Sequence, residues 1–116
     1  MSAVRIFHNP RCSKSRATLQ LLQDQGIEPD ISLYLEEPPS GSELKEILTL
    51  LGRTARELMR KGESEFSENQ LGNPDLTEDQ LIAAMVEHPR LIERPVVLAN
   101  GKAAVGRPPE SVLDIL

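Results

Sequence analysis

Hydrophobic and polar residues follow one another along the chain with two different periods. A period of two, or a short apolar run, is typical of a strand, and a period of three to four is typical of a helix. The first kind of pattern predicts strands at residues 4–7, 31–35, 96–98 and 103–105. Asn100-Gly101, which lies between the last two segments, is the strongest two-residue signal for a hairpin.

Helical periodicity accounts for most of the remaining chain. Three expected helix starts carry a capping box, in which serine or threonine is followed three residues later by glutamate or glutamine. The boxes are Ser40 with Glu43, Thr54 with Glu57, and Thr77 with Gln80. We expect the first of these helices to end at Gly52 and the last at His88-Pro89. The polar segment 62–75 predicts a loop with one helical turn.

Two more helices are expected nearer the ends of the chain. The first starts at or just after Cys12, carries Leu21 and Leu22 on its apolar face, and stops at Gly26. The second begins at Pro108-Pro109-Glu110, because proline suits the first turn of a helix, and runs to Leu116.

The order of the elements predicts the fold class. A helix that crosses over between two strands makes them parallel, whereas a hairpin makes its strands antiparallel. The sequence therefore predicts an α/β fold with a mixed four-stranded sheet and flanking helices. We expect one domain over residues 1–116, with a helical insertion at about residues 40–92 packed on the same core.

Composition narrows the class of protein. The net charge is −5, and one tyrosine and two phenylalanines are available to stack on bases, so nucleic-acid binding is not expected. No apolar run is long enough to span a bilayer, so we expect no membrane partner. A single cysteine is typical of a reducing compartment, which favours a cytoplasmic location. One cysteine and two separated histidines make no metal-binding cluster, so no metal is expected.

Cys12 is the first candidate functional residue. It lies between an apolar strand and a helix, where free backbone N–H groups and the positive end of the helix dipole favour a thiolate. The neighbouring cations Arg11, Lys14 and Arg16 act in the same direction. The same N–H groups can bind a tetrahedral oxyanion, so one turn offers both a nucleophile and an anion site.

Three later arginines lie at element ends, where ligand-binding groups often gather. Arg60 follows a short helix, Arg94 precedes Pro95 at a strand entrance, and Arg107 follows a strand exit. A guanidinium matches an oxyanion in a bidentate way. We expect a cis peptide bond between Arg94 and Pro95. His8 is either a partner of the Cys12 thiolate or a surface histidine at a strand end.

The chain resembles the glutaredoxin-linked arsenate reductase family, whose members have a thioredoxin-like fold, from about Ile6 to Leu116. The matching segments are His8-Asn9-Pro10-Arg11-Cys12, Glu28-Pro29 with Tyr34-Leu35, Leu58-Met59-Arg60-Lys61, Asp79-Gln80-Leu81-Ile82, Glu93-Arg94-Pro95-Val96-Val97, Gly106-Arg107-Pro108 and Val112-Leu113-Asp114.

The resemblance implies an activity and roles for the matching residues. Cys12 would be the nucleophile, and the oxyanion would be held by Arg60, Arg94 and Arg107. His8 and Ser15 would support the thiolate. No bound cofactor is implied, since glutathione would be the external reductant and glutaredoxin the protein partner that releases arsenite. The substrate would be arsenate or a similar tetrahedral oxyanion.

One motif departs from the well-studied members. They carry Gly-Thr after the cysteine, whereas this chain has Ser13-Lys14, as does a related branch of the family. A thiol oxidoreductase of other substrate is therefore an alternative function. A further alternative is a regulator that binds RNA polymerase, as in a distant branch that commonly carries a Cys-x-x-Cys switch. Position 15 is serine in this chain, so that switch cannot form.

Overall fold

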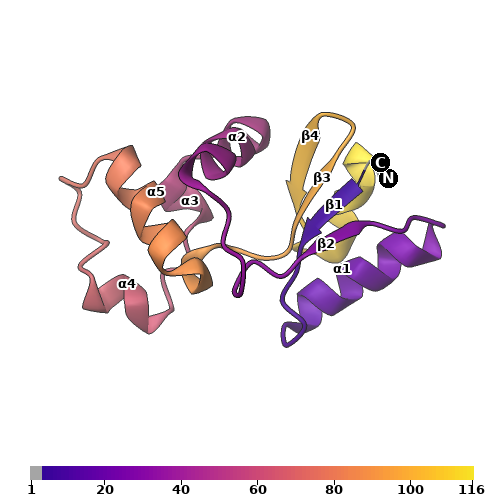
Figure 1. Cartoon of the computed structure of the whole chain (residues 1–116), viewed down its shortest axis with the longest axis horizontal. Coiled ribbons are helices and arrows are strands. Elements are labelled where there is room, and N and C mark those ends of the chain that lie inside the picture. Colours follow the sequence, from indigo (N-terminus) through magenta and orange to yellow (C-terminus); the bar gives the residue numbers. More distant parts are fainter. Residues whose placement is uncertain (1–3) are drawn as a thin grey trace. The chain divides into compact units, whose positions relative to one another are not determined.

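The computed structural model describes residues 4–116, which divide into two compact units (Figure 1). The first, here called the sheet unit, combines the segment up to Glu37 with Arg94–Leu116. The second, here called the helical unit, is Pro38–Glu93. The expectation of a single domain with an insertion at about residues 40–92 stays a prediction.

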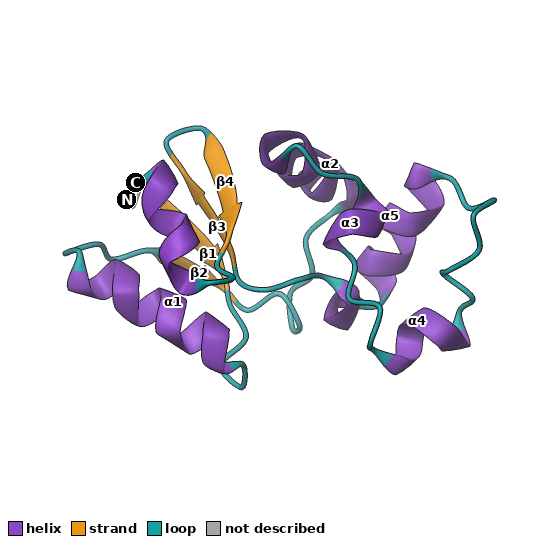
Figure 2. Cartoon of the chain, turned by 180° about the vertical axis from the view of Figure 1, so that it is seen from behind, coloured by secondary structure: helices purple, strands orange, loops and turns teal. Residues whose placement is uncertain are grey.

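The sheet unit contains all four strands, as the orange arrows in Figure 2 show. They are β1 (Val4–Phe7), β2 (Asp30–Ser32), β3 (Val96–Ala99) and β4 (Lys102–Val105), in the spatial order β2-β1-β3-β4. Strand β1 is parallel to β2 and antiparallel to β3, and β3 is antiparallel to β4. The predicted mixed four-stranded sheet is confirmed.

The register brings four strand ends to one edge of this sheet. Phe7 lies opposite both Ser32 and Val96, and Val96 lies opposite Val105. The chain therefore leaves β1, β2 and β4 and enters β3 at the same edge, here called the Phe7 edge. Loops at such an edge can place residues that are distant in sequence beside one another.

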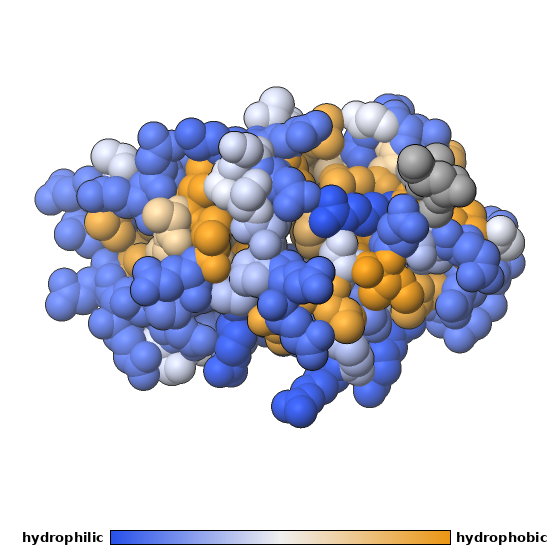
Figure 3. All heavy atoms as spheres, viewed as in Figure 1, coloured by the Kyte–Doolittle hydropathy of each residue, from blue (hydrophilic) through white to orange (hydrophobic). Residues whose placement is uncertain are grey.

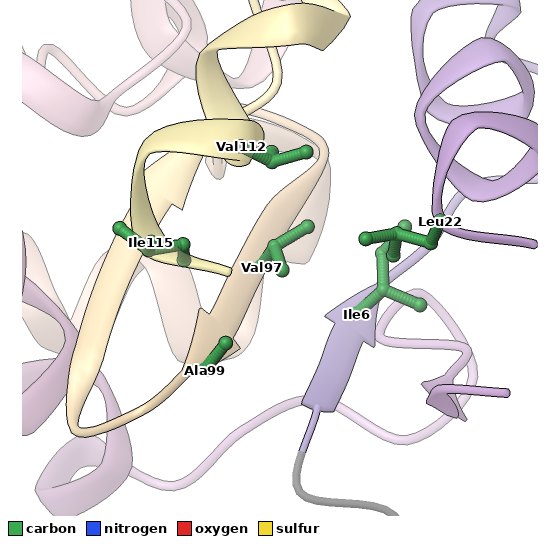
Figure 4. Close-up of a cluster of buried hydrophobic side chains, with 6 residues drawn as sticks. All are labelled: Ile6, Leu22, Val97, Ala99, Val112 and Ile115. Carbon is green, nitrogen blue, oxygen red and sulfur yellow. The ribbon is translucent and has the colours of Figure 1, made fainter. Parts of the chain in front are cut away.

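One face of the sheet is covered by α1 (Ser13–Asp24) and the 3-10 helix η2 (Pro109–Ile115). Figure 4 shows Ile6 and Leu22 beside one another, from β1 and α1, and Val112 and Ile115 on the helical segment next to β3. Ile6 and Leu22 have no exposed surface. Burial of a side chain of this size stabilises the folded state by about 1.5–3 kcal/mol, so this cluster holds α1 and its Cys12 end on the sheet.

Two predicted elements of the sheet unit differ from the structure. Strand β2 ends at Ser32 and not at residue 35, because the N–H groups of Glu36 and Glu37 both bond to the Leu33 carbonyl and turn the chain. The final helix is a 3-10 helix, with Ser111 N–H bonded to the carbonyl three residues earlier. Such tight winding is common in short segments.

The helical unit is formed by α2 (Gly41–Leu51), α3 (Ala55–Leu58), α4 (Ser64–Glu68), α5 (Glu78–Glu87) and the 3-10 helix η1 (Pro89–Leu91). Helix α5 contacts α2, α3 and η1. All three predicted capping boxes form, and Gly52 ends α2 with a left-handed backbone (φ 66°). The sequence pattern did not predict η1, which begins at the proline that stops α5.

The surface is mainly polar. Figure 3 shows a largely hydrophilic face with separate hydrophobic patches. Six large hydrophobic side chains of the described residues remain exposed: Ile31, Leu33, Leu35, Leu50, Leu113 and Leu116. No helix within residues 4–116 has the length and apolar character needed to cross a membrane.

Candidate active site

Cys12 is the N-cap residue of α1, as predicted. Its backbone is extended (φ −94°, ψ 122°), and its N–H donates to the Asn9 carbonyl at 3.0 Å. Its own carbonyl accepts from the N–H of Arg16 at 3.0 Å, which starts the helix. The thiol is half-buried and is the only one in the chain.

The pKa of the Cys12 thiol lies below its ordinary value. Burial alone would raise the pKa, but three groups more than offset that effect: the backbone N–H of Ser15, the Arg94 guanidinium and the backbone N–H of Lys14. All three favour the thiolate by placing positive charge near the sulfur. The side chains of Arg11, Lys14 and Arg16 are exposed, so water screens their charges, whereas Arg94 contributes to the lowered pKa.

Arg94 and Arg107 meet at the thiol. Arg107 Nε donates to the carbonyl oxygen of Arg94 at 2.7 Å, and Arg107 Nη2 lies 3.6 Å from Cys12 Sγ. The predicted cis peptide bond between Arg94 and Pro95 is confirmed, and Arg107-Pro108 is also cis, which the sequence pattern did not predict. The structure thus brings together two of the three predicted arginines with Cys12, on the side of the sheet where β3 and β4 lie.

Gly106 positions Arg107, and the sequence analysis did not single it out. Its N–H donates to the Pro95 carbonyl at 2.9 Å. A Cβ atom at position 106 would lie 2.5 Å from Thr18 Oγ1 and 2.8 Å from Pro95 Cγ, both closer than real Cβ contacts. Thr18 is itself fixed, because its hydroxyl donates to the Lys14 carbonyl at 2.8 Å. The only signal in the sequence was a glycine at the strand exit directly before Arg107.

His8 and Ser15 form a buried pair behind the Cys12 turn. Ser15 has no exposed surface and His8 is 6% exposed, so the surface-histidine alternative is wrong. His8 Nδ1 lies 2.6 Å from Ser15 Oγ, which also accepts the N–H of Asn9 at 3.0 Å. Burial lowers the pKa of His8. In the neutral tautomer that carries its proton on Nε2, the ring accepts at Nδ1, and the Ser15 hydroxyl can donate its one proton there.

Arg60 belongs to the helical unit. Its backbone N–H donates to the Leu91 carbonyl at 2.7 Å, beside the bridge between Met59 and Ile92. Its guanidinium pairs with Glu63 at 3.5 Å and with Glu93 at 3.4 Å. These contacts hold the side chain partly buried, and its role as an anion ligand stays a prediction.

The residues at this site match a known family. The ArsC family matches residues 7–115, which include the Cys12 turn and all three arginines. The chain belongs to the ArsC family. The family assignment made from the motifs is therefore confirmed.

Relatives of this ArsC protein match it over almost their whole length. An arsenate reductase of Neisseria meningitidis serogroup A is 52% identical over 100% of both chains. The uncharacterized protein YfgD of Escherichia coli K12 is 54% identical over 97% of this chain and 96% of its own. The solved structure of an arsenate reductase from Vibrio cholerae is 53% identical, with a TM-score of 0.96 and coverage of 99% of this chain and 98% of that one. The fold of this ArsC protein is thioredoxin-like, as the resemblance implied.

The ArsC site combines a thiolate with cations that can bind an oxyanion. The Cys12 sulfur can attack an electrophilic centre, while the Arg94 and Arg107 guanidinium groups can stabilise negative charge on oxygens bound to that centre. Within residues 4–116, no group of three or more histidine, cysteine or acidic side chains is placed to hold a metal ion. The thiolate and the two guanidinium groups beside it support nucleophilic chemistry at sulfur.

Proposed function

We propose that this ArsC protein reduces arsenate to arsenite with Cys12 as the nucleophile. The observation that carries the proposal is the position of Cys12 Sγ, at a helix N-terminus and 3.6 Å from Arg107 Nη2, with a pKa lowered in part by Arg94. Relatives at about half identity over full length bear the name arsenate reductase, which supports this substrate.

The arginines would bind the arsenate dianion against the overall charge of the chain. The net charge is −5, so attraction of an anion has to come from local groups. Arg94 and Arg107 would contact the arsenate oxygens beside the thiolate, and Arg60 would complete the set as the family motif implies. Planar guanidinium groups suit this task because each can donate two parallel hydrogen bonds to an oxyanion.

The reaction would begin with attack of the Cys12 thiolate on arsenic, with one oxygen leaving as water and a sulfur–arsenic bond forming. Arsenic still has to accept two electrons, and the chain has no second thiol to supply them. Glutathione would attack this adduct, and glutaredoxin would resolve the mixed species. In the net reaction, two thiols become one disulfide, arsenic(V) becomes arsenic(III), and one oxygen is lost as water. The supply of reduced thiols suits a cytoplasmic location.

A coupled assay tests the proposal. Arsenate-dependent oxidation of NADPH is measured with glutathione, glutaredoxin and glutathione reductase. We expect turnover by the natural chain and none above background by Cys12→Ser, because a serine hydroxyl stays protonated at neutral pH. If the two proteins give the same rate, the arsenate proposal fails.

A thiol oxidoreductase of other substrate is the second candidate function. It is favoured by Ser13, which occupies the first turn of α1 where the well-studied members have glycine. A serine side chain restricts how closely an anion can approach the backbone N–H groups of that turn. Reduction of small disulfides by the natural chain, without arsenate turnover, would favour this function.

A further inference from the structure

A cavity of about 250 Å³ lies beside the turn that leads into Cys12. It is lined by residues 8–11, which lead directly into Cys12, and by Leu33, Leu35 and Glu36 after β2. Nothing in the proposed binding of arsenate uses this cavity. Its walls belong entirely to the sheet unit.

The sheet topology sets the position of the cavity relative to the thiol. Strand β1 lies between β2 and β3, and the ends of β1, β2 and β4 and the start of β3 lie at the Phe7 edge. Arg94 and Arg107 come from the ends of β3 and β4, whereas the cavity is formed next to the end of β2. The turn bearing Cys12 follows the central strand β1, so it has the anion-binding arginines on one side and the cavity on the other.

The cavity is within reach of Cys12. Arg11 precedes Cys12 in the chain, so their Cα atoms are about 3.8 Å apart. The hydrogen bond from Cys12 N–H to the Asn9 carbonyl, at 3.0 Å, folds residues 9–12 into one tight turn. The cavity wall therefore adjoins the Cys12 backbone, and a bound molecule a few residues long can extend beyond the wall toward the sulfur.

The cavity walls combine apolar surface with one positive and one negative side chain. Leu33 and Leu35 are each 37% exposed and supply the apolar part of the wall. The turn closed by the Leu33 carbonyl and the N–H groups of Glu36 and Glu37 holds this wall in place. Arg11 and Glu36 supply opposite charges at the rim, and such a pair complements a zwitterion.

We propose that this cavity binds the reducing thiol, a small peptide thiol with a zwitterionic amino-acid end, of the chemical class of glutathione. The inference rests on the proposed function, which requires an external thiol because Cys12 is the only cysteine. Arg11 binds a carboxylate of the thiol, Glu36 binds its ammonium group, and the leucines contact its aliphatic part. Oxyanion and reductant thus approach the Cys12 sulfur from opposite sides, and neither has to leave before the other binds.

Binding is tested without any redox reaction by titrating the natural chain with S-methylglutathione, which cannot form a disulfide. Amide NMR signals of residues 8–11 and 33–36 are expected to shift together and to reach saturation. Signals of the β3–β4 hairpin at Asn100-Gly101 serve as the internal control and are expected to stay unchanged. Absence of saturable shifts, or shifts centred on other residues, would overturn the proposal.

Charge-neutral variants then test the recognition chemistry. Arg11→Gln is expected to weaken S-methylglutathione binding about fivefold, the effect of losing one exposed ion pair. Lys102→Gln is the matched control, since it removes a cation from the exposed start of β4, away from the Phe7 edge, and is expected to leave the affinity unchanged. Equal affinities of the natural chain and Arg11→Gln would contradict the assigned role of Arg11.

A third measurement connects the cavity to reactivity while leaving arsenate out. Cys12 is converted to its mixed disulfide with thionitrobenzoate, and release of the chromophore is followed with glutathione or with 2-mercaptoethanol. Arg11→Gln is expected to slow release by glutathione about fivefold, the same ion-pair loss, and to leave release by 2-mercaptoethanol unchanged. Equal slowing with both thiols would show an effect on the sulfur itself and overturn the proposal.

Cavity binding without arsenate turnover would refute the proposed function alone, and turnover without cavity binding would refute this inference alone.

Discussion

Arg107 is tied to the backbone of Arg94 by a hydrogen bond of 2.7 Å from its Nε atom to the Arg94 carbonyl oxygen. An outer nitrogen of the same guanidinium, Nη2, lies 3.6 Å from Cys12 Sγ. One side chain therefore connects the entrance of β3, the exit of β4 and the nucleophile. The planar, forked shape of a guanidinium makes this double contact possible.

The first prediction is that Arg107→Lys does not rescue Arg107→Gln. Lysine keeps the charge, but its single nitrogen cannot bond to the Arg94 carbonyl and lie at the sulfur together. Both variants are expected to lower kcat/KM for arsenate by about 10²–10³-fold, the effect of losing one preorganised donor. Steady-state kinetics in the coupled assay measures this. A lysine variant within a few-fold of the natural chain would show that only charge is needed.

The second prediction concerns the thiol. The backbone N–H groups of Ser15 and Lys14, together with Arg94, lower the pKa of Cys12 more than burial raises it. The rate of iodoacetamide alkylation plotted against pH is therefore expected to have its midpoint below about 8.5, the value of an unperturbed thiol. Arg94→Gln is expected to move that midpoint upward. An unchanged midpoint in Arg94→Gln would show that Arg94 does not activate the thiol.

The third prediction is that Gly106→Ala lowers both stability and activity. The added Cβ would lie 2.5 Å from Thr18 Oγ1 and 2.8 Å from Pro95 Cγ, and Pro95 cannot move freely within its ring. Overpacking of this kind costs about 1–3 kcal/mol, and it shifts Arg107, the next residue. Urea unfolding and kcat/KM are the two readouts. Gly62→Ala is the matched control, because nothing lies within 4 Å of a Cβ there. Equal unfolding midpoints for the two variants would contradict the prediction.

The fourth prediction is a pH dependence of stability that comes from His8. Burial lowers its pKa in the folded state below the ordinary 6.5, so below that pH the unfolded chain binds a proton that the folded chain does not. The His8 contribution to stability is complete above pH 6.5 and is lost as the pH falls through the folded-state pKa. Urea unfolding between neutral and mildly acidic pH measures the slope. His8→Asn is expected to reduce it, and an unchanged slope would assign the dependence to carboxylates.

The sequence predicted local features well where the signal is itself local. The Ser40, Thr54 and Thr77 capping boxes form because each involves only residues three apart. The hairpin at Asn100-Gly101 forms because both residues adopt the positive φ values that this turn needs, 55° and 72°. Strand β2 was predicted too long because Leu33 and Leu35 continue the alternating pattern, although backbone bonds turn the chain there.

Features of the site that depend on tertiary packing could not be predicted. Thr18 and Gly106 are 88 positions apart in the sequence. Only the structure shows that a Cβ atom at position 106 would lie 2.5 Å from Thr18 Oγ1. The sequence left open whether His8 is a partner of the Cys12 thiolate or a surface histidine, because that depends on how deeply His8 and Ser15 are buried. The cavity beside β2 could not be predicted from the hydrophobic pattern either, because that pattern assigned its apolar wall residues, Leu33 and Leu35, to a strand.

The pairing of β1 with β3 has a consequence for how the protein is made. Ile6 lies opposite Val97, 91 positions later by subtraction, so the central pair of the sheet cannot form until β3 has been synthesised. The helical unit lies between β1 and β3 in the sequence. Its capping boxes involve only nearby residues, so it can fold earlier on the ribosome. Cys12 is synthesised before Arg94 and Arg107. During translation the thiol is therefore without Arg94 and Arg107 at first, and these cations add to the effect of the helix N–H groups only after β3 and β4 have been synthesised.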